Sequence, residues 1–123
     1  SDLVTLHCPS TAATKHIINA ETIARMRRGA ILVNLGRGDL VDTPALVAAL
    51  RSGQIAGAAL DVCDPEPIPA GHPLLAMENV ILTPHIASAS PTAVRKLRET
   101  AANLAALAIR GQPLPTIVNR VKK

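Results

Sequence analysis

The sequence predicts an α/β fold built on a parallel sheet, and three observations indicate it. Short apolar runs of strand length alternate along the chain with segments that carry helix start and stop signals. These runs are aliphatic and lack polar alternation, as in strands buried within a parallel sheet. Polar, chemically useful residues follow three of the runs, and such sheets bind ligands beyond the carboxyl ends of their strands. We therefore expect a ligand site at one edge of the sheet.

The first third of the chain supplies two strands and one helix. Residues 1–7 enter a strand-like apolar run at once, so we expect the sequence to begin partway through a domain. Asn19 is a suitable N-cap for a helix over residues 20–28, with Gly29 in the terminating position. Residues 30–34 then form the second expected strand.

A second helix and a third strand follow. Thr43-Pro44 is a strong helix start, because proline lacks only an N–H that the first turn leaves unpaired. This helix should end near Ser52-Gly53. The small apolar residues 55–62 predict a strand that is covered on both faces.

The last part contains a stiff loop, a short strand and a long helix. Prolines between residues 65 and 73 restrict the loop that carries Glu66. Residues 80–82 form the fourth expected strand. Ser90-Pro91 opens a helix that runs to Arg110-Gly111. Its expected buried stripe consists of alanines with Leu97, Leu104 and Leu107.

Length and composition fit one domain with one core. The 123 residues are 48% apolar but include no Phe, Tyr or Trp, so the core is expected to be aliphatic. The lack of aromatic residues also removes the stacking platforms of single-stranded nucleic-acid binders. The formal net charge is +4, but the basic residues are dispersed along the chain. We therefore expect no nucleic-acid partner.

The cysteine, histidine and hydropathy patterns argue against a secreted protein, a metal-binding protein and a membrane protein. Cys8 and Cys63 are isolated thiols, and the sequence shows no secretory signal, so we expect a reduced, cytoplasmic protein. The four histidines lack close ligand spacing, which predicts no metal site. No apolar stretch approaches the roughly 20 residues that span a bilayer, so we expect no membrane partner.

Three segments hold the residues suited to chemistry. They are Asn34-Leu35-Gly36-Arg37-Gly38, Leu60-Asp61-Val62-Cys63-Asp64-Pro65-Glu66-Pro67 and Leu82-Thr83-Pro84-His85-Ile86. Together they offer one permanent cation, one carboxylate and one imidazole at strand ends. This set suits the binding of a small acid and the movement of its proton.

In these motifs the chain resembles the later half of the nucleotide-binding domain of the D-isomer-specific 2-hydroxyacid dehydrogenases. The resemblance covers essentially the whole chain and also includes Ser1-Asp2-Leu3-Val4-Thr5-Leu6-His7-Cys8-Pro9, Gly29-Ala30-Ile31-Leu32-Val33-Asn34 and Arg37-Gly38-Asp39-Leu40-Val41-Asp42. It implies a Rossmann-like, doubly wound fold and an oxidoreductase that uses NAD or NADP on a small 2-oxo or 2-hydroxy acid. Pro65-Glu66-Pro67 and His72-Pro73 look most like the glyoxylate and hydroxypyruvate reductases.

The resemblance implies a role for each of three residues, Arg37, Glu66 and His85, which we call the trio. Arg37 would bind the substrate, since a guanidinium fork holds a carboxylate and polarises the adjacent carbonyl. His85 would protonate the carbonyl oxygen as hydride arrives from the nicotinamide, and would act as the base in the reverse direction. Glu66 would hydrogen-bond His85, favour its protonated form and orient its ring. Asp64 has the same chemistry but lies two residues from the family's position.

The same resemblance implies contacts with the cofactor. Asp61 matches the residue that meets the nicotinamide end, while Leu35 and Gly36 supply backbone contacts. The other expected cofactor-binding residues are His7, Pro9, Thr14, Arg37, His85, Ala87 and Ser88.

The sequence lacks the G-x-G-x-x-G motif that holds a dinucleotide's pyrophosphate, since Gly36-Arg37-Gly38 is followed by Val41 at the third glycine position. That motif, the residue that selects NAD or NADP, and the substrate domain are expected outside this sequence. We assign residues 1–110 to a partial NAD(P)-binding domain and residues 111–123 to a tail leading toward the substrate domain. The isolated chain should be inactive, and the complete protein should be a homodimer.

Other readings stay open. A dinucleotide-linked protein-association module would need no proton donor, so the complete trio disfavours it. A phosphoglycerate dehydrogenase-type enzyme shares much of the pattern. A bare α/β fragment would cover its exposed sheet edge by self-association. The identity of the 2-hydroxy acid does not follow from these residues.

Overall fold

The computed structural model describes residues 1–117, which belong to two compact units. The first unit is Ser1–Ala87, and the second begins at Ser88. The long C-terminal helix belongs to the second unit. No helix in this described part is long and apolar enough to cross a membrane.

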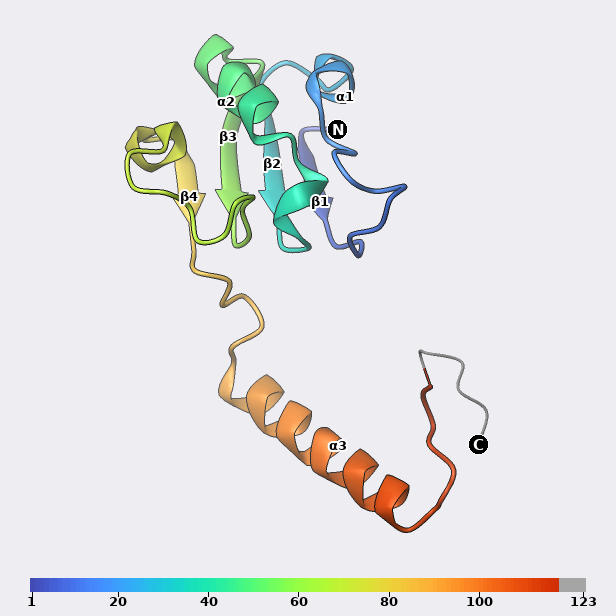
Figure 1. The fold of residues 1–123 in the computed structure, drawn as a ribbon. Coiled ribbons are helices and arrows are strands. Elements are labelled where there is room, and N and C mark those ends of the chain that lie inside the picture. Colours follow the sequence, from blue (N-terminus) through green and yellow to red (C-terminus); the bar gives the residue numbers. More distant parts are fainter. Residues whose placement is uncertain (118–123) are drawn as a thin grey trace. The chain divides into compact units, whose positions relative to one another are not determined.

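The first unit is built on a parallel sheet whose strands follow chain order (Figure 1). The strands are β1 (Leu3–Leu6), β2 (Ala30–Asn34), β3 (Ile55–Leu60) and β4 (Val80–Leu82). One row of the register joins their last residues: Leu6, Asn34, Leu60 and Leu82. The four carboxyl ends therefore align at one edge, and the loops that follow the strands emerge there. This confirms the expected parallel α/β sheet.

Two capped helices lie over one face of this sheet (Figure 1). In α1 (Ala20–Ala24), the Asn19 side chain accepts the backbone N–H groups of Glu21 and Thr22, which confirms the expected N-cap. In α2 (Thr43–Ser52), Asp42 accepts the N–H of Ala45, and Gly53 ends the helix with a left-handed backbone. α1 is shorter than predicted because the chain leaves the helix at Arg25, before it reaches Gly29.

The core between the helices and the sheet is aliphatic, as expected. Its most buried side chains are Leu32, Leu40, Leu46, Ile55 and Leu74. Leu40 belongs to the short 3-10 helix η1 (Gly38–Leu40), and Leu74 belongs to η2 (Pro73–Ala76). Both short helices lie in connections for which the sequence predicts no regular structure.

Within Ser1–Ala87 both helices lie on one face of the sheet and no helix covers the other, so residues 55–62, predicted to be covered on both faces, are covered on one face in this unit, and Ala56 is exposed. Leu3 and Ile31 are neighbours in the register and remain 52% and 43% exposed, and Ile81 is 66% exposed. Alternate residues point to opposite faces, and both helices lie on one of them. β3 also ends at Leu60, two residues earlier than predicted.

The second unit contains α3 (Pro91–Ile109). Ser90 caps it by accepting the N–H of Ala93, and Pro91 occupies the first turn, as the sequence predicted. None of its residues is buried among the described residues, and Leu97 is 71% exposed. The second unit by itself therefore does not bury the expected stripe, although Leu104 and Leu107 are half-buried.

A glycine brings two site-forming segments together. A Cβ on Gly38 would lie only 1.9 Å from the carbonyl oxygen of Cys63 and 2.7 Å from the nitrogen of Asp64. The turn after β2 therefore lies directly against the loop after β3. Any side chain at position 38 would push these two segments apart.

The Gly38→Ala variant should destabilise the chain by about 1–3 kcal/mol, the usual cost of inserting a methyl group into a packed site. Its amide NMR signals should shift at Cys63 and Asp64. Gly71→Ala is the control for these two signals and not for stability, because open space surrounds Gly71 but its φ of 80° strains an alanine. That variant should leave those two signals in place, and an unshifted Cys63 amide in Gly38→Ala would contradict the contact.

Candidate active site

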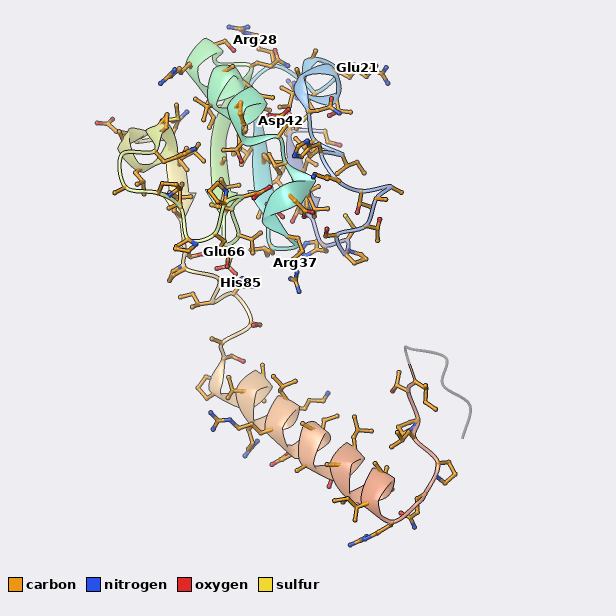
Figure 2. All side chains as sticks on the ribbon, viewed as in Figure 1. Glu21, Arg28, Arg37, Asp42, Glu66 and His85 are labelled. Carbon is orange, nitrogen blue, oxygen red and sulfur yellow. The ribbon has the colours of Figure 1, made fainter. Side chains whose placement is uncertain are left out.

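Three chemically capable side chains lie at the carboxyl edge of the sheet. Arg37 follows β2, Glu66 lies in the loop after β3, and His85 follows β4. Figure 2 labels all three along the same edge of the first unit. Parallel topology thus brings together residues that are up to 48 positions apart, from 37 to 85.

Glu66 and His85 form a direct side-chain pair. The Oε1 atom of Glu66 lies 2.7 Å from Nδ1 of His85, and both side chains are a little under half exposed. Because Glu66 accepts a proton at Nδ1, the Nε2 atom is the ring nitrogen left to meet a ligand. This arrangement orients the imidazole and stabilises it when it is protonated.

The backbone at His85 is unusual. Its φ angle is 55°, in the left-handed region that residues other than glycine seldom adopt. Its N–H donates to the carbonyl oxygens of Asp61 at 2.9 Å and Thr83 at 3.0 Å. The sharp turn directs the side chain toward Glu66 instead of continuing the line of β4.

Arg37 lies in a turn held by a buried asparagine. The Nδ2 group of Asn34 donates to the carbonyl of Arg37 at 2.8 Å, and Oδ1 of Asn34 accepts the N–H of Gly36 at 3.0 Å. Asn34 is only 1% exposed, whereas Arg37 is exposed. The Arg37 guanidinium donates to the Gly36 carbonyl at 2.8 Å and has no carboxylate partner among residues 1–117. Its charge is therefore available to an anion.

Sequence reasoning missed the role of Asn34. The available signal was a polar residue at the end of an otherwise apolar strand, directly before the Gly-Arg-Gly turn. An amide offers both a donor and an acceptor, so one side chain satisfies two backbone groups of the turn.

Asp61 is a buried carboxylate at the centre of this edge and is 4% exposed. It accepts the Thr83 hydroxyl at 2.5 Å and the N–H groups of Ile86 and Ala87, each at 2.9 Å. The Thr83 hydroxyl is the main cause that lowers the pKa of Asp61 below its usual 3.8; these amides and nearby His85 lower the pKa further, against the effect of burial. Asp61 is therefore ionised at neutral pH.

Two hollows flank these groups. A pocket of about 370 Å³ is mostly apolar and is lined by residues of the β3 and β4 ends, including Asp61, Cys63, Glu66, Thr83 and His85. A second pocket of about 430 Å³ lies at the ends of β1 and β2 and is lined by His7, Cys8, Pro9, Ser10, Leu35, Gly36 and Arg37. Burial, together with the charge of Glu66, raises the pKa of the Cys63 thiol, which disfavours a thiolate nucleophile.

The expected cofactor-binding residues fall into separate groups. His7, Pro9, Leu35, Gly36 and Arg37 line the second pocket, while Asp61 and His85 line the first. Thr14 lines neither, but its hydroxyl donates to the Pro9 carbonyl at 2.7 Å and so holds that loop. Ala87 uses its N–H on Asp61, and Ser88 belongs to the second unit. Within residues 1–117, no three His, Cys, Asp or Glu side chains gather as metal ligands.

The Asp61→Asn variant should lose stability in a pH-dependent way. A carboxyl whose pKa is lower in the folded chain stabilises the fold above the usual pKa, and this contribution disappears as the pH falls through the lowered value. The loss in unfolding free energy should therefore be constant above about pH 5 and shrink at lower pH. Urea unfolding from neutral to acidic pH measures it.

Asp64→Asn, which alters an exposed carboxyl in the neighbouring loop, is the matched control. A loss in Asp61→Asn that does not change with pH would contradict the ionised state of Asp61.

Comparisons with known proteins agree on one family. The sequence model of one protein family, described as D-isomer specific 2-hydroxyacid dehydrogenase, NAD binding domain, matches residues 1–87. A glyoxylate reductase of Thermofilum pendens is 48% identical over 120 residues, which are 98% of this chain and 35% of that protein. A human glyoxylate reductase/hydroxypyruvate reductase is 40% identical over 116 residues, 94% of this chain and 35% of that protein.

A solved structure agrees as well. The crystal structure of a D-lactate dehydrogenase with NAD+ from Lactobacillus jensenii matches with a TM-score of 0.89 and 36% identity, over 98% of this chain and 40% of that one. The chain thus spans about a third of the length of the curated relatives described above. Residues 1–87 place the chain in the D-isomer specific 2-hydroxyacid dehydrogenase family, within its NAD-binding domain.

Proposed function

We propose that the complete protein containing this segment is an NAD(P)-dependent oxidoreductase that interconverts a small 2-oxo acid and its 2-hydroxy acid. The observation that carries the proposal is the Glu66–His85 pair at the carboxyl edge of the sheet, together with the exposed Arg37 at the same edge, which has no carboxylate partner among residues 1–117. An acid substrate needs both a cation for its carboxylate and a proton source for its carbonyl oxygen. Arg37 and His85 supply these two functions.

The lining of the two pockets fits the nicotinamide part of a dinucleotide. Parallel α/β sheets bind such ligands at this edge, and the second pocket combines polar and apolar groups around Gly36 and Pro9. When bound, the reduced nicotinamide supplies the hydride that adds to the carbonyl carbon of the substrate. The choice between NAD and NADP depends on a ribose-contacting residue that this segment does not contain.

The proton in this reaction comes from His85. Its Nε2–H donates to the carbonyl oxygen of the 2-oxo acid, and the oxygen takes up this proton as the carbon receives hydride. Glu66 remains on Nδ1 and stabilises the imidazolium before the transfer. In the reverse direction, neutral Nε2 accepts the hydroxyl proton while hydride leaves the carbon.

Arg37 holds the substrate during this step. A guanidinium binds a carboxylate through two parallel hydrogen bonds, which fixes the orientation of the attached carbonyl. Glyoxylate and hydroxypyruvate are the favoured substrates, supported by the names of the two curated relatives. A cytoplasmic location and homodimeric assembly complete the proposal; the unpaired thiols of Cys8 and Cys63 fit a reducing compartment.

The His85→Gln variant of the complete protein should reduce kcat by about 10²- to 10⁴-fold, because glutamine does not donate a proton as an acid. The dissociation constant of the reduced cofactor, measured by fluorescence, should change little. The matched control is His16→Gln: His16 has a similar left-handed φ of 51° but lies outside both pockets described above. Equal kcat values in His85→Gln and the wild type would reject the assigned proton donor.

The Arg37→Ala variant should lower kcat and raise the KM for the 2-oxo acid together, because the same guanidinium binds the acid and polarises its carbonyl. Its kcat/KM should fall at least about 100-fold, as expected for the loss of a charge-assisted pair. Arg51→Ala, in the last turn of α2, is the control for removal of an exposed arginine. Similar kinetics in both variants would refute the role of Arg37.

A further inference from the structure

The left-handed turn at His85 needs a support that its own sequence does not provide. A residue with a Cβ pays a conformational cost at a φ of 55°, and such a backbone persists only where its surroundings hold it. The N–H groups of three consecutive residues, His85, Ile86 and Ala87, all donate to Asp61. His85 uses the Asp61 carbonyl, and the other two use its carboxylate.

The Asp61 side chain is itself fixed by one further donor. Its Oδ1 atom accepts both the Thr83 hydroxyl and the Ile86 N–H, whereas Oδ2 accepts the Ala87 N–H. The Thr83 bond, at 2.5 Å, is the shortest of the three. It joins a neutral donor to a buried charge, the kind of hydrogen bond that is stronger than one between neutral groups.

Thr83 is not part of the hydrophobic core. It is exposed, so its hydroxyl would bind water if it did not bind Asp61. Its carbonyl also accepts the His85 N–H at 3.0 Å. The residue thus contacts the turn from both its backbone and its side chain, and only the side-chain contact depends on its being threonine or serine.

We propose that Thr83 is a positioning residue for His85, acting through Asp61. Its hydroxyl fixes the Asp61 carboxylate, the carboxylate holds the Ile86 and Ala87 amides, and the turn so formed directs the imidazole to Glu66. The significance for catalysis rests on the proposed function, whereas the support of the turn is independent of it.

Amide hydrogen exchange in the 123-residue chain tests the structural part. Thr83→Val keeps the shape of the side chain but removes the hydroxyl, so the Ile86 and Ala87 amides should exchange about tenfold faster or more. The Ala58 amide, which donates to Asn79 across the sheet, should be unchanged. Thr83→Ser keeps the hydroxyl and should restore protection to within about twofold.

Thr43→Val is the matched control. It removes a hydroxyl that donates to the Asp64 carbonyl at 3.2 Å in the same unit, without touching Asp61. Because Thr83 is exposed, Thr83→Val should remain folded, which circular dichroism checks. Unchanged exchange at Ile86 and Ala87 in Thr83→Val, equal acceleration in Thr43→Val, or failure of Thr83→Ser to restore protection would overturn the proposal.

Kinetics of the complete protein test the catalytic part. A misplaced His85 should lower kcat by about tenfold or more, while KM for the acid and for the cofactor should change by less than about threefold. Thr83→Ser should recover most of kcat. Faster amide exchange with wild-type kcat would refute the catalytic role of Thr83. An inactive wild type would instead refute the proposed function, and amide exchange would then decide whether Thr83 holds the turn.

Discussion

The parallel pairing of four strands in chain order is the constraint on which the rest of the molecule depends. The last residues of β1 to β4 form one row across the sheet, so every segment that follows a strand begins at the same edge. A guanidinium, a carboxylate and an imidazole from distant parts of the sequence therefore lie along this edge, and the carboxylate and imidazole are in direct contact (Figure 2). The helices and the aliphatic core pack against one face of the sheet and stabilise this arrangement of strand ends.

Two buried polar side chains turn this row of strand ends into a site. Asn34 and Asp61 are the buried polar or charged residues among those described, and the Asp61 N–H donates to the Asn34 carbonyl at 3.0 Å. Asn34 holds the turn that presents Arg37, and Asp61 holds the turn that presents His85. A buried polar group is costly unless its hydrogen bonds are satisfied, and here the backbone of the two turns satisfies them. The same hydrogen bonds thus offset the free-energy cost of burying Asn34 and Asp61 and hold the turns that carry Arg37 and His85.

Sequence patterns predicted the elements well where the signal was local. Asn19, Pro44 and Ser90-Pro91 mark helix starts through their own side chains or fixed backbone angles, and each prediction agrees with the structure. The prediction of a strand over residues 30–34 is also confirmed, because a short, continuous aliphatic run is typical of a buried strand. The covering of residues 55–62 on both faces is not met within Ser1–Ala87, because it depends on elements packed from elsewhere, which a local pattern does not report.

For the candidate site, the sequence predicted the pairing of Glu66 with His85 but not the residues that hold the turns around it. Arg37, Glu66 and His85 stood out through their motifs, and the 2.7 Å contact between Glu66 and His85 agrees with the expected pairing. The contribution of Asn34 arises from local hydrogen bonds within its turn, whereas those of Gly38 and Thr83 arise from close backbone approach and a tertiary hydrogen bond. The Asp61–Thr83 and Gly38–Cys63 contacts join residues 22 and 25 positions apart, and no periodicity in the sequence encodes them.

The most direct measurement is a crystal structure of the complete protein with reduced cofactor and oxamate, a mimic of a 2-oxo acid that resists reduction. We expect oxamate to lie at the carboxyl edge of the sheet, with its carboxylate on the Arg37 guanidinium. Its carbonyl oxygen should lie about 2.6–3.2 Å from Nε2 of His85, the reach needed for proton transfer. Oxamate bound away from both residues, or His85 separated from Glu66 in the complex, would contradict this expectation.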